Sequence, residues 1–295
     1  MRYQYYPGCS LEGTALEYDA STRAVMASIG AELFEIDDWS CCGASAAEAT
    51  SHLLSLALPA RNLALAEKRP DVTDILAPCS ACYLNLKKVE EKTRHAPDLL
   101  QTINSILAED QLQVSGRMHV RHLLDVMSGD VGPQMIREHV KKKLAGLRVA
   151  AYYGCQCLRP YAVFDDPEDP HSMEPLLEAV GARVHPWKMG GKCCGASHMN
   201  TNMEVGLQLV AAILQSAKEA DAIVTVCPMC QMNLEAHQKK ISRKVGEDLS
   251  ISILYLPQLL GLALGLTEQQ LRLDLNLSLT IDCRKKLGLH SPSPR

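Results

Sequence analysis

Cys193-Cys194-Gly195-Ala196-Ser197 is the stretch that decides the fold, because the same five residues also occur as Cys41-Cys42-Gly43-Ala44-Ser45. Each copy follows a Gly-Cys pair and precedes a Cys-x-x-Cys motif, at residues 8–9 and 79–82 in the first half and at 154–155 and 227–230 in the second. Ten of the twelve cysteines therefore follow one order twice. Chance does not produce such a repeat, so the sequence predicts an internal duplication with one similar unit in each half.

Short apolar runs precede the cysteines of both halves. Their composition predicts strands, which we expect at 3–6, 32–36 and 74–77 and at 148–153, 183–187 and 222–226. Helical patterns separate them, at 15–29, 46–68 and 203–219. Alternating strands and helices are typical of parallel sheets, so the predicted fold class is α/β, with two similar doubly wound-like domains. The strands end at the cysteines, which would gather the thiols of each half at the carboxyl edge of its sheet.

The chain between and after the motifs sets the predicted domains. Helical patterns at 99–107, 119–127 and 134–144 form a spacer, so we place an N-terminal domain at 1–146 and a C-terminal domain at 147–295. Residues 251–266 are interrupted by Pro257 and Gly261 and fall short of the roughly 20 residues of a membrane-spanning helix. We expect a core helix there, with a surface-bound amphipathic helix as the alternative. The last five residues are expected to be disordered.

Composition restricts the classes of function. A net charge of −4 gives no electrostatic reason to expect a nucleic acid partner. The first residues carry no pattern of an export signal, so we expect a cytoplasmic location, with peripheral membrane contact as an option. In a reducing compartment, twelve cysteines favour metal ligands or catalytic thiols over structural disulfides.

The adjacent cysteines narrow the chemistry. A Cys-x-x-Cys motif at a strand end is a chelating pair that suits zinc, an iron–sulfur cluster or a redox dithiol. Neighbouring side chains point apart, which serves a multi-iron cluster better than a single ion. Five cysteines per half also exceed the four ligands of a zinc site or a cubane cluster. Iron–sulfur clusters are therefore favoured, while zinc in one or both halves and disulfides stay open.

From Cys9 to about Gly265 the pattern resembles the Cys-Cys-Gly domain family, which includes the B subunit of heterodisulfide reductase and related subunits of succinate, glycolate and lactate oxidoreductases. The length, with no attached ferredoxin-like motif, favours the heterodisulfide reductase B subunit. The resemblance implies that each half binds a non-cubane 4Fe–4S cluster. Its implied ligands are Cys9, Cys41, Cys42, Cys79 and Cys82 in the first half and Cys155, Cys193, Cys194, Cys227 and Cys230 in the second.

The resemblance also implies the function of an iron–sulfur catalytic subunit that cleaves or forms a disulfide or thiol substrate. Electrons would arrive through a ferredoxin-like C subunit from a flavin-containing A subunit. One alternative is an electron-relay or anchoring subunit of a succinate or fumarate–quinone oxidoreductase, in which residues 251–266 would touch the membrane. Another is a structural zinc-binding interaction protein.

Four further residues are candidates for roles at these sites. Cys157 is an extra cysteine that could be an active-site thiol, an alternative ligand or a small buried residue. His198 could donate a proton to a leaving thiolate or be a solvated surface residue. Asn85 and Asn233 each follow a Cys-x-x-Cys motif by three positions, where the amide could reach a cluster sulfur or tie a backbone turn.

Overall fold

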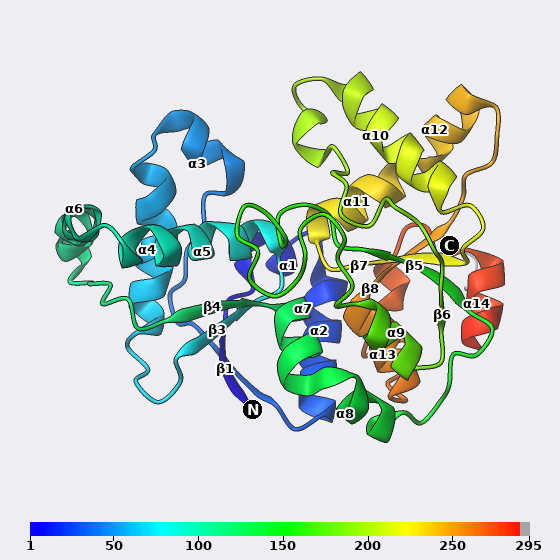
Figure 1. Ribbon diagram of the computed structural model, residues 1–295, viewed down its shortest axis with the longest axis horizontal. Helices are drawn as coiled ribbons and strands as arrows, with labels where there is room; N and C mark the ends of the chain where they lie inside the picture. The colour runs from blue at the N-terminus through cyan, green and yellow to red at the C-terminus, as the bar shows by residue number, and fades with distance from the viewer. Residues whose placement is uncertain (290–295) are drawn as a thin grey trace.

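The computed structural model describes residues 1–289 and contains two α/β halves, each built on a four-stranded parallel sheet (Figure 1). The first sheet has the order β2-β1-β3-β4 and consists of β1 (Arg2–Tyr5), β2 (Glu32–Glu35), β3 (Asp74–Ala77) and β4 (His119–His122). The second has the order β6-β5-β7-β8 and consists of β5 (Arg148–Tyr152), β6 (Arg183–Val184), β7 (Ala222–Thr225) and β8 (Ser252–Tyr255). One strand order used twice confirms the predicted fold class and the internal duplication.

Helices make the crossovers, because parallel strands cannot be joined by a tight turn. The first half contains α1 (Gly8–Glu12), α2 (Leu16–Ser28), α3 (Ala44–Thr50), α4 (Leu54–Ala66), α5 (Ser80–Arg94), α6 (Pro97–Leu107) and the short η1 (Ala108–Asp110). The halves are linked by α7 (Leu123–Val126), the π-helical η2 (Met127–Val131) and α8 (Gly132–His139). The second half contains α9 (Glu174–Ala179), η3 (Ala196–His198), α10 (Met203–Ser216), α11 (Pro228–Ala236), α12 (Gln238–Val245), α13 (Leu256–Ala263), η4 (Leu273–Leu275) and α14 (Ile281–Leu287).

The fourth strand of each sheet lies where a helix was expected. Residues 119–127 were predicted as one helix, but β4 pairs with β3 from Asp74↔His119 to Ala77↔His122, and only then does α7 begin. Residues 251–266 likewise split into β8, which pairs with β7, and α13. In both places the predicted helix began too early, because a four-residue strand that runs directly into a helix is too short for its own period to be recognised. The predicted helix over 46–68 is also broken, because Ser51 is extended between α3 and α4.

Helix α13 belongs to the core. All eight of its residues are buried, and it packs on α2 of the first half. Residues 251–264 are all buried and only Gly265 and Leu266 reach the surface, which is contrary to the membrane contact expected of this segment in the alternative function. Within the part of the chain that the structure describes, no helix has the length and apolar character needed to cross a bilayer.

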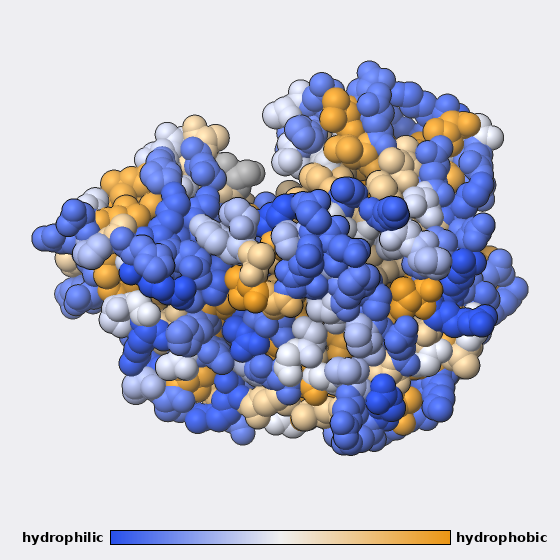
Figure 2. All heavy atoms as spheres, viewed as in Figure 1, coloured by the Kyte–Doolittle hydropathy of each residue, from blue (hydrophilic) through white to orange (hydrophobic). Residues whose placement is uncertain are grey.

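The two halves share one hydrophobic core, which includes Leu76 from β3 and Leu254 from β8. Helices α8 and α9 also pack together across the boundary. The division between residues 146 and 147 stays a prediction, and the expected disorder of the last five residues concerns positions outside the described range. Above the sheets, α3 and α10 stand on opposite sides, and Figure 2 shows the surface hollowed between these two lobes.

Candidate functional site

The cysteines of the first half gather where its strands end. Cys9 follows β1, Cys41 and Cys42 follow β2, and Cys79 and Cys82 flank the start of α5 after β3. The Sγ atoms of Cys9 and Cys41 are 3.8 Å apart, and those of Cys42 and Cys82 are 3.6 Å apart. Cys9 and Cys41 are exposed whereas the other three are buried, so this group opens to solvent on one side.

The second half repeats the arrangement in a more enclosed form. Its cysteines line one cavity of about 60 Å³. None of them is exposed, since two are half-buried and three are buried. The residues concerned are Cys155, Cys193, Cys194, Cys227 and Cys230. The structure thus brings together both of the predicted ligand sets.

A glycine passes directly against a thiol in each half. Gly8 and Gly154 have φ angles of +69° and +73°, in the region that side chains disfavour. A Cβ atom on Gly8 would lie 2.6 Å from Cys82 Sγ, and one on Gly154 would lie 3.0 Å from Cys230 Sγ. Only glycine leaves this space beside the thiols free.

Matching tyrosines hold the two Cys-Cys turns in place. The Tyr6 hydroxyl donates to the carbonyl oxygen of Ser40, the residue before Cys41, at 2.7 Å. The Tyr152 hydroxyl donates to the carbonyl oxygen of Lys192, the residue before Cys193, at 2.7 Å. Both tyrosines are fully buried at the end of the first strand of their sheet, so the position of each turn is tied to the sheet.

Asn85 and Asn233 tie the helix after each Cys-x-x-Cys motif to the Cys-Cys turn. Asn233 Nδ2 donates to the Cys194 carbonyl oxygen at 2.7 Å. Asn85 Nδ2 donates to the Ala44 carbonyl oxygen at 3.2 Å and also lies 3.6 Å from Cys42 Sγ. Both asparagines therefore fix the turn, and the sulfur contact expected of them occurs in the first half.

Hydrogen bonds between the thiols shift the pKa values of the cysteines in both groups. A hydrogen bond from Cys41, and then one from Cys82, lowers the pKa of Cys42 to about 3. A hydrogen bond from Cys155 lowers the pKa of Cys193 to about 6, and one from Cys230 lowers that of Cys227 to about 7. The thiolate is the form that binds metals, so both groups favour the ligating form of at least one cysteine.

The donor set limits which metal groups fit. Each half offers five thiols, which are soft ligands that suit both iron–sulfur clusters and zinc, and five exceed the four that a zinc ion takes. Within residues 1–289, no three His, Cys, Asp or Glu side chains are arranged to hold a single metal ion. The space that Gly8 and Gly154 leave beside a thiol is a second feature that fits a bound group.

The two candidate catalytic residues lie in different environments. Cys157 is 1% exposed, and its Sγ donates to the Tyr153 carbonyl oxygen at 3.2 Å. Its place in the duplication is that of Leu11, which is also 1% exposed. His198 is exposed on η3 and close enough to Cys193 to help stabilise its thiolate. Their roles stay predictions.

Sequence reasoning missed a contact between the two cysteine groups. Ser80, which follows Cys79, lines the cysteine cavity of the second half. Its Oγ lies 3.2 Å from the carbonyl oxygen of Val226 and 3.2 Å from His122 Nε2. The sequence feature that could have pointed to Ser80 is that Pro228 occupies its position in the second Cys-x-x-Cys motif, although the two motifs otherwise match.

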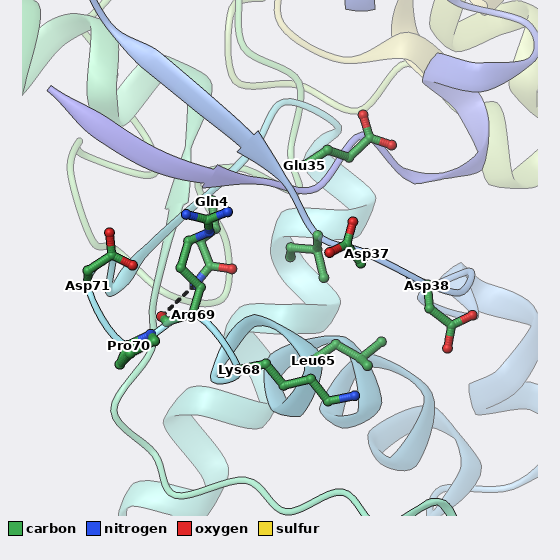
Figure 3. Close-up of a pocket in the computed structure, with 10 residues that line it drawn as sticks. Gln4, Glu35, Asp37, Asp38, Leu65, Lys68, Arg69, Pro70 and Asp71 are labelled. Atoms are coloured by element: carbon green, nitrogen blue, oxygen red, sulfur yellow. Dashed lines mark hydrogen bonds between the residues drawn. The ribbon is translucent and has the colours of Figure 1, made fainter.

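A larger cavity of about 350 Å³ lies beside β1 and β2 of the first sheet (Figure 3). It is lined by exposed charged residues such as Asp38 and Lys68, and by Gln4, whose amide lies 3.5 Å from the Arg69 carbonyl oxygen. No cysteine lines this cavity, so it is separate from the thiol groups.

Comparison with known proteins agrees with a duplicated, cysteine-rich fold. The model of the CCG cysteine-rich domain family matches residues 3–87 and 149–235. The membrane anchor subunit of the 8-methylmenaquinol:fumarate reductase from Wolinella succinogenes is 36% identical over 93% of this chain and 96% of its own length. A protein from Archaeoglobus profundus, named as similar to the heterodisulfide reductase B subunit, is 30% identical over 90% of this chain and 91% of its own.

Two more distant relatives extend the comparison. The B subunit of the ferredoxin/F420H2-dependent CoB-CoM heterodisulfide reductase from Methanosarcina acetivorans is 28% identical over 96% of this chain and 95% of its own. A crystal structure of a hypothetical protein from Helicobacter pylori matches 95% of this chain with a TM-score of 0.76 at 16% identity. This chain spans about half of that protein, 52%, and the likeness shows the fold alone. The chain belongs to the CCG cysteine-rich domain family and carries one copy of the domain in each half.

Proposed function

We propose that this chain is the iron–sulfur subunit of a heterodisulfide reductase-like oxidoreductase complex, with one cluster in each half and a disulfide or thiol as substrate. The observation that carries the proposal is the pair of five-thiol groups at equivalent sheet edges of a duplicated fold. Relatives named as heterodisulfide reductase B subunits, aligned over almost the whole chain, support the choice of complex.

Each half would hold its cluster with the cysteines that follow its strands: Cys9, Cys41, Cys42, Cys79 and Cys82, and Cys155, Cys193, Cys194, Cys227 and Cys230. When bound, such clusters supply electrons one at a time, and two of them match the two electrons exchanged when an S–S bond is cleaved or formed. The type of cluster, non-cubane 4Fe–4S, is part of the proposal.

The protein's own residues would position the ligands and handle protons. Tyr6 and Tyr152 hold the Cys-Cys turns, and the open side of the first group at Cys9 and Cys41 gives substrate or partner access. His198, exposed beside Cys193, is suited to give a proton to a leaving thiolate. Cys157 has no such access, because it is buried against Tyr153.

The proposal includes the rest of the complex. A ferredoxin-like C subunit and a flavin-containing A subunit would supply electrons, since relatives of this chain are named as subunits of heterodisulfide reductase complexes. The location would be cytoplasmic, with any membrane contact made at the surface of the bilayer.

A second candidate is an electron-relay or anchoring subunit of a fumarate–quinone oxidoreductase. The relative from Wolinella succinogenes, 36% identical and named as the membrane anchor subunit of a fumarate reductase, favours it. In that function both thiol groups would pass electrons and no disulfide would bind. The two candidates share the clusters and differ in the substrate.

The test begins with anaerobically purified chain. We expect brown protein with iron and acid-labile sulfide in near-equal amounts. In a dye-linked disulfide reduction assay, Cys42→Ser and Cys194→Ser should each abolish turnover, because one cluster cannot hold both sulfur atoms between electron steps. Cys283→Ser is the matched control, because Cys283 is buried outside both groups and should leave turnover intact.

Three outcomes are decisive. Iron-loaded protein that reduces no disulfide but restores electron transfer to a fumarate reductase would favour the second candidate. Near-full activity in either cysteine variant would show that its half is only a relay or a structural site. Colourless protein with stoichiometric zinc in both halves would overturn both candidates.

A further inference from the structure

Ser80 belongs to the first half but lines the cysteine cavity of the second. It is 1% exposed in the first turn of α5, directly after the ligand candidate Cys79. Its Oγ lies 3.2 Å from the carbonyl oxygen of Val226, the residue immediately before Cys227. The hydroxyl therefore stands between the two cysteine groups.

His122 fixes the direction of this hydroxyl. The Leu124 N–H donates to His122 Nδ1 at 3.2 Å, so this nitrogen carries no proton. Burial lowers the pKa of His122 to about 3, so the ring is neutral and its single proton lies on Nε2. Nε2 donates to Ser80 Oγ at 3.2 Å, which directs the hydroxyl's own proton toward the second half. Tyr83 and Phe164 pack on the ring and hold it, with centroids 5.3 and 6.1 Å away.

Two acceptors compete for that proton. The Val226 carbonyl oxygen has another donor, because the Tyr18 hydroxyl lies 3.0 Å from it. Cys227 follows Val226 directly and lines the same cavity as Ser80, and a thiolate accepts a charge-assisted bond that is stronger than one to a neutral carbonyl. Cys157 is buried nearby, and its Sγ donates to the Tyr153 carbonyl oxygen at 3.2 Å. A metal-bound Cys227 would thus attract the Ser80 proton.

The second Cys-x-x-Cys motif has no residue that could make the equivalent bond to the first cysteine group. Pro228 occupies the position of Ser80 in the second Cys-x-x-Cys motif, and proline has neither a hydroxyl nor a backbone N–H. In the first half the donor to a ligand sulfur is Asn85, which belongs to the same half as its acceptor Cys42. Ser80, by contrast, reaches the second group from the other half.

We propose that Ser80, held by His122, is a positioning residue of the second-half cluster, which donates a hydrogen bond to Cys227 and makes that cluster easier to reduce. The inference rests on the clusters of the proposed function. A hydrogen bond to a ligand sulfur stabilises the reduced cluster, which carries one more negative charge. In that step the cluster gains one electron from the partner subunit or an added reductant, and no bond is made or broken.

The test is a redox titration of the full-length, cluster-loaded chain with dithionite, followed by electron paramagnetic resonance. Spectra of Cys42→Ser and Cys194→Ser assign the signals to the halves. Ser80→Ala should lower the midpoint of the second-half cluster, so that its reduced-to-oxidised ratio at a fixed potential falls about fivefold. The first-half midpoint should not move. Ser80→Thr should restore the wild-type value because it keeps the hydroxyl.

Two further variants complete the design. His122→Phe keeps the ring packing but removes the bond to Ser80, so it should shift the same midpoint by a smaller amount. Ser10→Ala removes a hydroxyl beside Cys9 in the first half and should move no second-half midpoint. If Ser80→Ala does not load, Ser80→Thr and His122→Phe still decide the question.

An unchanged second-half midpoint in Ser80→Ala, with both clusters present, would overturn the inference but leave the proposed function standing. An equal shift of the first-half and second-half midpoints in Ser80→Ala would also overturn the inference. If Ser80→Ala fails to load its clusters, an unchanged second-half midpoint in His122→Phe would overturn it instead. Wild-type protein without iron and sulfide would instead remove the proposed function, and the inference with it.

Discussion

Tyr18 and Tyr255 stack face to face across the boundary between the halves, with ring centroids 4.1 Å apart and planes inclined by 3°. Tyr18 lies on α2 of the first half, and Tyr255 ends β8 of the second. The Tyr18 hydroxyl also lies 3.0 Å from the carbonyl oxygens of Pro78 and Val226, the residues before the two Cys-x-x-Cys motifs. One buried side chain thus contacts both halves close to both cysteine groups.

This contact predicts that the halves unfold together. Tyr18→Ala should destabilise the whole chain by about 3–5 kcal/mol, because it removes a fully buried aromatic side chain from the shared core. Thermal unfolding should remain a single transition by circular dichroism and by visible absorbance. Tyr161→Ala, which removes a half-buried tyrosine outside that core, is the control and should cost much less. Two separate transitions in wild type would show that the halves are independent domains.

The glycines beside the thiols give a second prediction. Gly8→Ala and Gly154→Ala should each lose the cluster of their own half, because the new Cβ would occupy the space next to Cys82 or Cys230. Iron content and the resonance spectrum of each half measure this loss.

Gly30→Ala is the matched control for these two variants. Gly30 has a φ angle of +74° but no atom within 4 Å of the added Cβ, so the backbone strain is similar and the clash is absent. It should cost roughly 1 kcal/mol of stability and leave the iron content unchanged. Full iron content in Gly8→Ala and Gly154→Ala would mean that the gap is not needed for a cluster.

Cys157 can be tested as a packing residue. Cys157→Ala should keep the iron of both halves and most of the disulfide turnover, while the cavity it leaves lowers the stability by about 1–2 kcal/mol. Chemical denaturation and the dye-linked assay measure the two effects. Loss of turnover in a stable, fully loaded Cys157→Ala protein would restore Cys157 as the active-site thiol.

Glu235 predicts a pH dependence of stability. Its Oε1 accepts hydrogen bonds from Leu277 N at 3.2 Å and from Ser278 N at 3.3 Å, which ties α11 to the segment after η4. Burial raises the pKa of Glu235 to about 7, above the value of about 4.3 in an unfolded chain. Because the folded state binds this proton more tightly, its contribution to stability is complete below about pH 4.3 and is lost as the pH rises through about 7.

Glu235→Gln cannot ionise, so its stability relative to wild type should increase between pH 5 and pH 8. The urea midpoints of both proteins over this range provide the measurement, and Glu32→Gln on an exposed strand position is the control. A constant difference between wild type and Glu235→Gln would contradict a raised pKa in the folded state.

Much of the site could be predicted from the sequence alone. The repeated Cys-Cys-Gly turns, each preceded by a strand, placed ten thiols at two sheet edges because parallel strands all end on the same side. Asn85 and Asn233 could be singled out because each lies three residues after a Cys-x-x-Cys motif, and a fixed offset along a helix determines what a side chain can reach. These are local relations, which the order of residues determines directly.

Only the tertiary structure decided the rest. β4 and β8 are strands because β3 and β7 offer them backbone partners, and a four-residue segment has too little intrinsic preference to show this in its own sequence. The bond from His122 to Ser80 and the stacking of Tyr18 on Tyr255 join residues that are 42 and 237 positions apart. The first contact depends on how α5 packs on β4 within the first half, and the second on how the two halves dock; both are properties of packed surfaces and of no local pattern.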